Sequence, residues 1–349
     1  MTKSSKNRDN LILEFIESNP LCSSKEIHDG LSEKIGYATV KRILQKLLSE
    51  NLITLTGKGK GTKYEISQAY NLLRQIDVEQ YFGKEIDERI IRNNFNYSLI
   101  RETLNSIFLF SKEELAHLTN LQNRYKRNIS KLSATEYNKE LERLAIDLSW
   151  KSSQIEGNTY SLLETERLLK EKEIAAGKTK DEAVMLLNHK AALDFIIANP
   201  SYVKKMTVSI IEDIHSMLIN DLGIARNIRN SIVGITGTNY KPLDNEFQIK
   251  EALEDMCAVV NEKENVFEKA LLILILISYI QPFADGNKRT TRIISNAILM
   301  NNNFCPISFR TVDSIEYKKA MLVFYEQNNI NAFKEIFINQ FEFAVGTYF

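Results

Sequence analysis

A nearly uninterrupted apolar run from Ala270 to Ile280 constrains this chain more than any other stretch. The apolar pattern alone allows a buried strand or a buried helix, but the run is long for a strand. It is also far shorter than the ~20 residues that a membrane span needs, so no membrane association is expected. Pro282 follows closely, and proline stops a helix. The run therefore predicts a buried core helix that ends at a loop.

The composition favours a helical protein with a substantial core. Glycine and proline are scarce, at 13 and 5 of 349 residues, which predicts long helices in a mainly α fold, and the length suits two domains. Hydrophobic residues make up 44% and charged residues 26%, as in globular proteins. Lys and Arg total 45, as do Asp and Glu, a balance that argues against a chain devoted wholly to nucleic acid but allows a local basic patch.

The cysteines and the N-terminus indicate a cytoplasmic protein. Cys22, Cys257 and Cys305 lie far apart, without metal-ligand spacing, and are expected to be reduced thiols. The polar start of the chain lacks the hydrophobic region of a signal peptide.

Residues 1–67 carry the pattern of three helices and a hairpin. Apolar residues at helical spacing predict helices over 10–17, over 25–31 and from Thr39 onward. The segments LITLT and TKYEIS alternate apolar and polar residues around the glycine-rich GKGKG, which predicts two short strands joined by a turn. This order resembles a winged helix-turn-helix, a small α+β domain.

Basic residues gather in the same region. Between Lys34 and Lys63 the sequence has seven basic residues and one acidic residue, a net charge of +6. The resemblance places the third helix in the major groove of DNA, with Lys41 and Arg42 near phosphates or base edges. Lys58 and Lys60 on the wing would contact the DNA backbone. In the alternative interpretation, the domain mediates protein contacts and its lysines are a solvated face.

Residues 68–139 read as a helical connector that leads into the second domain. They are charged, helical in period and poor in glycine and proline. From Ile76 to Asn93 the charge sign alternates, which predicts an exposed helix. Nothing in the connector indicates chemistry. His117 and His189 stand in helical contexts without a second ligand nearby and are expected to be structural.

The loop QPFADGNKRTTR, after the apolar run, combines the parts of a phosphate site. Helical spacing resumes beyond it, so the main-chain N–H groups of residues 286–289 reach a helix start, where anions bind. Lys288 and Arg289 add positive charge, and Arg292 lies on the same helical face as Arg289. Asp285 adds a hard oxygen suited to Mg²⁺ that bridges phosphates. The stretch predicts a di- or triphosphate cradle, and the alternative is a capped helix with exposed basic residues.

This stretch resembles the signature of the Fic (Fido) family, His-Pro-Phe-x-Asp/Glu-Gly-Asn-Gly/Lys-Arg-x-x-Arg, which joins two helices. Residues 281–292 match it at every defined position but the first (Pro282, Phe283, Asp285, Gly286, Asn287, Lys288, Arg289 and Arg292). Most members transfer AMP from ATP to a protein hydroxyl, so the resemblance implies ATP, Mg²⁺ and a target protein. It implies that Asp285 holds Mg²⁺, that Asn287 and Arg289 hold the phosphates, and that Phe283 packs into the core. Lysine at position 288 also occurs in the Doc branch, which transfers phosphate, so the orientation of the nucleotide stays open.

The resemblance extends over most of residues 140–349 and implies an all-α Fic domain. Residues 229–242, RNSIVGITGTNYKP, resemble the family's β-hairpin flap, which aligns a target segment by strand addition and is centred here on Gly234, Ile235, Thr236 and Gly237. The stretch YKKAMLVFYEQNN resembles the helix after the core, where Tyr317 is implied to contact the base. Members often self-associate, which implies a homo-oligomer.

Residues 152–157, SSQIEG, fit the family's inhibitory pattern, Ser/Thr-x-x-x-Glu-Gly/Asn, which begins here at Ser152. The resemblance implies that Glu156 pairs with Arg292 and keeps this arginine from the γ-phosphate of ATP, and such pairs can be strong. The alternative is a helix end marked by Gly157. Both interpretations can hold, since an inhibitory helix also has to end.

Gln281 stands where the family has its catalytic histidine. A neutral imidazole can take the proton from an incoming hydroxyl, whereas a glutamine amide has no useful basicity. Loss of a general base typically removes ~10²–10⁴ in rate, while the phosphate cradle is built from other atoms. His215 is the alternative base, but nothing in the sequence brings it to the site.

Three functions stay open at this point. The first is an autoinhibited Fic-type protein adenylyltransferase that Gln281 slows or inactivates. The second is an ATP-binding, DNA-binding transcriptional regulator without transferase activity. The third is a DNA-binding protein whose large domain is only a surface for dimerisation or a partner.

Overall fold

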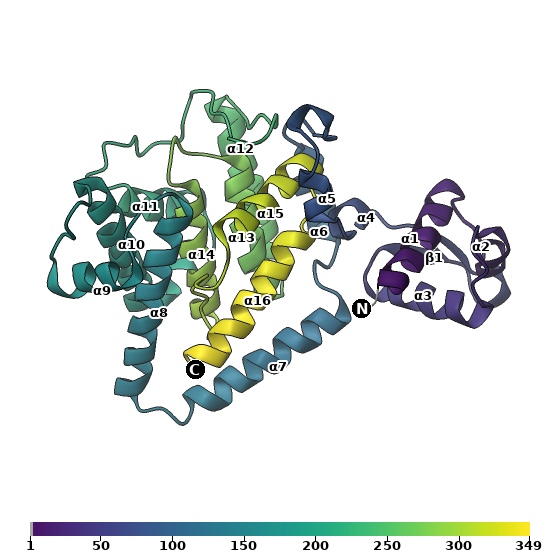
Figure 1. Cartoon of the computed structure of the whole chain (residues 1–349), viewed down its shortest axis with the longest axis horizontal. Helices are drawn as coiled ribbons and strands as arrows, with labels where there is room; N and C mark the ends of the chain where they lie inside the picture. Colours follow the sequence, from purple (N-terminus) through teal and green to yellow (C-terminus); the bar gives the residue numbers. More distant parts are fainter. Residues whose placement is uncertain (1–2) are drawn as a thin grey trace. The chain divides into compact units, whose positions relative to one another are not determined.

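The structure, a computed structural model, describes residues 3–349, except the side chains of residues 3–7 and of Lys60 (Figure 1). The described chain divides into two compact units. Unit 1 contains the residues up to Gln75 and Ser106–Ala116, and unit 2 contains Ile76–Asn105 and His117–Phe349. The predicted connector, residues 68–139, is therefore divided between the two units.

Unit 1 has three helices followed by a hairpin, in the order that the sequence predicts. Its elements are α1 (Lys3–Ser18), α2 (Ser24–Gly30), α3 (Tyr37–Ser49), β1 (Ile53–Thr56), the 3₁₀ turn η1 (Gly59–Gly61), β2 (Lys63–Ile66) and α4 (Tyr70–Leu73). The strands pair antiparallel, with Ile53 opposite Ile66. The helices turn apolar side chains into a common core, including Ile12, Ile16, Ile27, Val40, Leu44 and Leu47.

Unit 2 is built almost entirely from helices. Its early elements are α5 (Val78–Phe82), the 3₁₀ turn η2 (Ile86–Glu88) and the π-helical turn η3 (Leu99–Thr103). The unit boundaries fall within α6 (Leu104–Ser106) and α7 (Lys112–Ile129). The remaining elements are α8 (Ala134–Ile155), α9 (Leu162–Glu171), α10 (Lys180–Ala198), η4 (Pro200–Val203), α11 (Val208–Leu218), α12 (Glu246–Glu262), α13 (Val266–Ile280), α14 (Asn287–Asn301), α15 (Ser314–Gln327) and α16 (Asn331–Thr347).

The segment from Ile76 to Asn93 differs from the exposed helix that its charge pattern predicts. Only α5 and η2 are helical there, and the chain is otherwise irregular. The reason is a buried ion pair. The side chain of Arg89 is 3% exposed and lies 3.1 Å from Glu326, whose side chain is fully buried. Because Arg89 is buried against Glu326 of α15, this segment does not form a continuous helix with all its charged side chains in solvent.

The apolar run forms α13, as predicted, at the centre of unit 2. The side chain of Asn265 caps its start by accepting two main-chain N–H bonds, and the residues from Ala270 to Ile280 are all buried. Helix α14 packs against α13 more extensively than any other pair of described elements, and α12 and α15 also contact α13. The loop between α13 and α14 is therefore anchored at both ends in the core.

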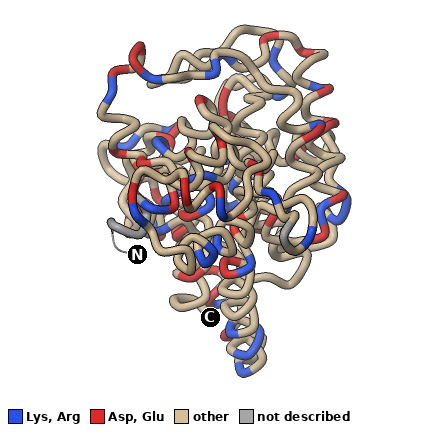
Figure 2. Tube along the Cα trace, turned by 90° about the vertical axis from the view of Figure 1, so that its right-hand side faces the viewer, with Lys and Arg blue, Asp and Glu red and all other residues tan. Residues whose placement is uncertain are grey.

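The described helices and the distribution of charge agree with the composition. None of the described helices combines the length and apolar character that crossing a bilayer requires. Figure 2 shows basic and acidic residues interspersed along the trace.

Candidate functional site

The loop between α13 and α14 is shaped by two residues in the left-handed conformation. Gln281 ends α13 with φ at 52°, and Gly286 begins α14 with φ at 85°. A Cβ added at Gly286 would lie 3.2 Å from the side chain of Ile219 and 3.3 Å from that of His215. Position 286 therefore favours glycine for its conformation, and a Cβ there would also press on these two neighbours.

Asn287 braces the loop from within. Its Nδ2 donates to the carbonyl of Phe283 at 2.8 Å and to Oε1 of Gln281 at 3.0 Å, and its Oδ1 accepts from the N–H of Phe283 at 2.9 Å. The sequence predicts a phosphate contact for Asn287. In this structure its amide group is used within the loop, which leaves its main-chain N–H for an anion.

His215 supports the loop from beneath. Its ring stacks on the buried ring of Phe283, with centroids 3.6 Å apart, and its Nε2 lies 2.9 Å from the carbonyl oxygen of Asp285. Burial lowers the pKa of His215 to about 4, so the ring is neutral and donates to that carbonyl. His215 thus does reach the loop, which no sequence pattern predicts, but it does not line the pocket.

Two buried arginines stand beside the start of α14. Arg289 is 1% exposed and Arg292 is fully buried. Nε and Nη1 of Arg289 and Nη1 of Arg292 are buried and have no hydrogen-bond partner among the described residues. The N–H of Gly286 donates to Oδ1 of Asp285 at 2.6 Å, but no described side chain caps α14, so the N–H groups of residues 287–289 lack partners among the described residues. Buried guanidinium donors and free helix N–H groups together favour an anion.

Glu156, at the C-terminal end of α8, is paired with Arg292. Oε1 of Glu156 lies 2.7 Å from Nη2 of Arg292, and Lys288 Nζ lies 3.6 Å from Oε2. Arg292 also donates to the hydroxyl of Ser152 at 2.8 Å and to its carbonyl at 2.9 Å. Burial would raise the pKa of Glu156, but the charges of Arg292 and Lys288 outweigh it and hold this pKa below its usual value. Gly157, with φ at 100°, turns the chain away directly afterwards.

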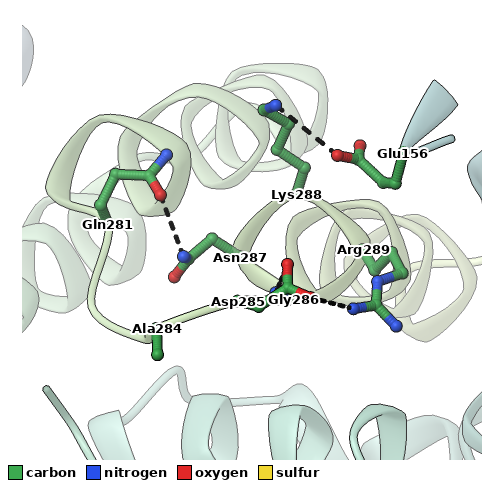
Figure 3. Close-up of a pocket in the computed structure, with 8 residues that line it drawn as sticks. All are labelled: Glu156, Gln281, Ala284, Asp285, Gly286, Asn287, Lys288 and Arg289. Atoms are coloured by element: carbon green, nitrogen blue, oxygen red, sulfur yellow. Dashed lines mark hydrogen bonds and ion pairs between the residues drawn. The ribbon is translucent and has the colours of Figure 1, made fainter. Parts of the chain in front are cut away.

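A small polar pocket lies over the helix start (Figure 3). Its free volume is about 70 Å³, well below the ~300–1,000 Å³ of typical small-molecule sites. Glu156 and Lys288 point toward one another on one side, and Gln281 points toward Asn287 on another. The pocket is lined by Glu156, Gln281, Ala284, Asp285, Gly286, Asn287, Lys288 and Arg289. Glu156 thus fills part of the space beside the predicted cradle.

Gln281 lines this pocket, and none of the groups that hydrogen-bond its side chain in the described part of the chain is a base. Its Nε2 donates to the carbonyl of Ser278 at 2.6 Å and lies 3.5 Å from the hydroxyl of Tyr325. Burial raises the pKa of Tyr325 far above its usual value, so this hydroxyl stays protonated. Neither the amide of Gln281 nor the hydroxyl of Tyr325 can accept a proton near neutral pH.

Asp285 and Tyr317 lie at different depths of the site. The Asp285 side chain is 63% exposed, and its Oδ2 lies 3.1 Å from Nη2 of Arg289. The ring of Tyr317 is fully buried, with the guanidinium of Arg292 5.3 Å from its centroid. Tyr317 therefore supports Arg292 in this structure and does not line the pocket, although the sequence predicts a base contact for it.

The flap is a loop here, not the predicted β-hairpin. Residues 229–242 contain no strand, and Gly234, Ile235, Thr236 and Gly237 lie in an irregular stretch with a turn at 236–237. Main-chain bonds at the two ends of the segment run outward, from the N–H of Arg229 to the carbonyl of Pro282 and from the N–H of Lys241 to the carbonyl of Asn93. Lys241 pairs in parallel with Asn94, as a single isolated bridge.

Arg229, at the start of this loop, is a site residue that sequence reasoning missed. It is 5% exposed, and its Nε donates to the carbonyl of Gln281 at 2.6 Å. Its Nη2 donates to the carbonyl of Leu243 at 2.5 Å, and its own N–H donates to the carbonyl of Pro282 at 2.9 Å. Arg229 thereby ties both ends of the flap to the phosphate loop. No local pattern marks it, because its partners are distant in the chain.

The predicted DNA-binding residues of unit 1 lie on its surface where they are described. Lys41 and Arg42 are exposed on α3, and Lys58 is exposed before η1. The side chain of Lys60 lies outside the described part of the structure. Two other basic residues of the same region are engaged in ion pairs, Lys46 with Asp9 at 2.5 Å and Lys63 with Glu26 at 2.9 Å.

Comparison with known proteins gives matches to one family. Residues 205–299 match the family model described as Fic/DOC family. The protein adenylyltransferase fic-1 of Caenorhabditis elegans is 29% identical over 177 residues, covering 48% of this chain and 34% of that protein. The protein adenylyltransferase Fic of Nematostella vectensis is 31% identical over 172 residues, covering 48% of this chain and 40% of that protein. The chain thus spans well under half the length of the curated relatives it matches.

The solved structures agree at the level of the fold. A structure of Fic-1 from Caenorhabditis elegans matches with a TM-score of 0.59 and 22% identity, covering 68% of this chain and 72% of that chain. The family match spans the loop that holds the pocket, together with the apolar helix before it. Residues 205–299 of this chain therefore form a Fic/DOC family domain.

Proposed function

We propose that unit 2 binds the phosphates of ATP at the start of α14 and is built to transfer AMP to a protein hydroxyl. In this proposal Glu156 restrains the transfer and Gln281 slows it. The observation that carries it is the pair of buried arginines, Arg289 and Arg292, whose free donors stand beside an uncapped helix start. The relatives named protein adenylyltransferase support the choice of AMP transfer.

The free donors call for an anion. A buried hydrogen-bond donor that is left without a partner costs about 1–3 kcal/mol, and more when the group is charged. Here Arg289 is buried with Nε and Nη1 unpartnered among the described residues. Phosphate oxygens accept bidentate bonds from guanidinium groups and also bind the N–H groups of a helix start. A polyphosphate would satisfy both sets of donors at once.

Asp285 fits a role in holding Mg²⁺. This cation is usually bound by one or two carboxylates together with substrate phosphates and water. The carboxylate of Asp285 is largely exposed beside the phosphate cradle, and no group of three or more His, Cys, Asp or Glu that could hold a metal occurs in the described part of the chain. A Mg²⁺ ion bound there with the nucleotide would neutralise phosphate charge.

Glu156 and Gln281 limit the reaction in different ways. Glu156 occupies Nη2 of Arg292, so a γ-phosphate that is to bind this nitrogen must displace a carboxylate. Gln281 offers an amide where the attacking hydroxyl has to lose its proton. The first effect weakens productive binding of the nucleotide, and the second slows chemistry after binding. The acceptor is a hydroxyl of an unidentified target protein or of the chain itself.

Calorimetry with Mg²⁺ and ATP tests the proposal. The native chain is expected to bind ATP, and Arg289→Met, which keeps much of the buried volume, is expected to weaken binding. The loss of charge-assisted bonds worth about 1.5–3 kcal/mol corresponds to roughly a 10- to 150-fold higher Kd. Arg101→Met removes an exposed arginine of the same unit and should leave Kd unchanged. Equal ATP affinity in the native chain and Arg289→Met would contradict the proposed site.

A second candidate function, DNA binding by unit 1, has its own support. The outer face of α3 presents Lys41 and Arg42, and its opposite face packs into the core. The ion pairs of Lys46 and Lys63 make the available basic surface smaller than the charge count of the sequence suggests. We infer that any phosphate contacts centre on Lys41, Arg42 and the wing.

Salt-dependent binding to duplex DNA measures this second function. Lys41→Ala and Arg42→Ala are each expected to weaken binding and to reduce the slope of log K against log salt concentration by about 1. Lys84→Ala removes an exposed lysine of unit 2 and serves as the control. A slope that stays the same in both α3 variants would exclude this face of α3 as the DNA contact.

A further inference from the structure

Residues 76–93, which are mostly irregular where the sequence predicts an exposed helix, contact the flap loop (residues 229–242) at three points. Arg89 Nη2 donates to the carbonyl of Gly237 at 2.8 Å, and Asn239 Nδ2 donates to Asp87 Oδ1 at 3.1 Å. The N–H of Lys241 donates to the carbonyl of Asn93 at 2.9 Å. Residues 87–93 therefore support residues 237–241 of the loop.

Arg89 is the buried member of this support. Its Nη1 lies 3.1 Å from Oε1 of Glu326, a fully buried carboxylate near the end of α15. Its guanidinium lies 5.0 Å from the ring centroid of Phe82 and 5.8 Å from that of Tyr81. The hydroxyl of Tyr81 donates to Oε2 of Glu326 at 2.6 Å. The carboxylate of Glu326 holds Nη1 of Arg89, and the rings of Tyr81 and Phe82 hold the plane of its guanidinium. Nη2 is therefore fixed in its direction toward Gly237.

Gly237 is the residue of the loop whose carbonyl Arg89 holds. It has φ at 91°, at the turn over residues 236–237, and a Cβ added there would lie 3.3 Å from the side chain of Leu322 on α15. The turn thus lies against α15, with its carbonyl held by Arg89. Tyr240 is a second anchor of the loop, because it is 2% exposed and its hydroxyl donates to the carbonyl of Tyr279 at 3.0 Å, whereas Ile232 is 82% exposed.

A hollow of about 750 Å³ follows the same loop. It is lined by Asn93, Ile232, Val233, Gly234, Ile235, Thr238, Asn239, Tyr240, Lys241, Pro242 and Asp244. One wall of the hollow is formed by Asn93 and the other by the flap loop. The contacts of residues 87–93 with residues 237–241 hold these two walls together. Its volume lies within the ~300–1,000 Å³ of common ligand sites, large enough to receive a segment of another chain.

We propose that Arg89 is a positioning residue that fixes the turn at residues 236–237 on α15 and so holds the wall of this hollow for a target segment. The role of the hollow in holding a target rests on the proposed function of AMP transfer. Arg89 itself touches neither the pocket over α14 nor any reacting atom. Its effect on transfer passes through the loop, which is tied to Gln281 by Arg229.

The test removes the anchor while keeping the fold. Arg89→Met alone would leave Glu326 buried without its counter-charge, so the informative variant is Arg89→Met with Glu326→Gln, which removes both charges at similar volume. A nitroxide on Thr236→Cys reports the mobility of the turn by electron paramagnetic resonance. Thr236 is exposed, and the native cysteines Cys22, Cys257 and Cys305 are buried, so the label goes to the introduced thiol.

The control separates anchoring from stability. Tyr81→Phe removes the bond from Tyr81 to Glu326 but leaves the bond from Arg89 to Gly237. It is expected to lower Tm while the label at position 236 stays immobile. The double variant is expected to keep a Tm near that of the native chain while the rotational correlation time of the label falls several-fold. Its Kd for ATP should stay within about twofold of the native value, because the phosphate cradle is untouched.

The outcomes distinguish this inference from the proposed function. A label equally immobile in the native chain and in Arg89→Met/Glu326→Gln would overturn the role of Arg89. A label equally mobile in Tyr81→Phe and in the double variant would overturn it too, because the effect would then follow stability. If the native chain binds no ATP, the proposed function fails, and the mobility measurement still decides whether Arg89 holds the turn.

Discussion

In a chain that carries Glu156→Gly, the further change Gln281→His is expected to raise AMP transfer by about 10²–10⁴-fold, the usual contribution of a general base. Gln281 lines the pocket over the start of α14, so an imidazole at this position faces the same space. Its main chain is held by Arg229 through the carbonyl of Gln281, which depends little on the side chain. A neutral imidazole can accept the proton that an amide cannot.

Autoradiography with α-labelled ATP measures this increase. The label should appear on the chain itself or on an added target protein, and its rate of incorporation should depend on residue 281. Gln281→Asn in the same Glu156→Gly background keeps an amide and serves as the matched control. A histidine variant that incorporates label no faster than the asparagine variant would count against acid–base chemistry at position 281.

Glu156→Gly alone is expected to tighten the binding of ATP by roughly 10- to 150-fold, since Arg292 gains charge-assisted bonds worth about 1.5–3 kcal/mol. In the native chain Nη2 of Arg292 is taken by Glu156 at 2.7 Å. The variant frees the hydrogen that this nitrogen donates to Glu156, while its bond to the carbonyl of Ser152 stays in place, and it also enlarges the small pocket that Glu156 lines.

The same variant is expected to be less stable without nucleotide. It leaves Arg292 fully buried without its carboxylate, a loss that typically amounts to about 3–5 kcal/mol. Saturating ATP should restore about 2.7 kcal/mol at one hundred times Kd. Glu171→Gly serves as the control, because it removes an exposed carboxylate from the end of α9. It should change neither the affinity for ATP nor the stabilisation that ATP provides. A Glu156→Gly chain that nucleotide fails to stabilise would be the contrary result.

Much of the site could be predicted from local sequence, because local physics determines it. The apolar run needs burial on every side, which predicts the buried helix α13. Pro282 and Gly286 then predict the break and the new helix start, and the structure places both as expected. The family resemblance of residues 152–157 implies that Glu156 pairs with Arg292, and the side chains of Ser152, Glu156 and Arg292 do meet. Whether this contact inhibits the chain stays a prediction.

What the sequence could not predict depends on partners far away in the chain. Arg89 looks like a solvated charge in its alternating segment, but it pairs with Glu326, 237 positions away. Arg229 likewise gives no local sign of its bonds to the phosphate loop. The flap pattern predicts a hairpin, yet its backbone bonds go to neighbouring segments. In each case tertiary contacts override the local pattern.

Calorimetric titration of ATP with Mg²⁺ into four proteins tests the central claim most directly: the native chain, Glu156→Gly, Arg292→Met and the double variant. If Glu156 acts by occupying Arg292 at a phosphate site, Glu156→Gly lowers Kd at least tenfold, and this gain vanishes in the Arg292→Met background. An equal gain in both backgrounds, or no gain in either, would contradict the account.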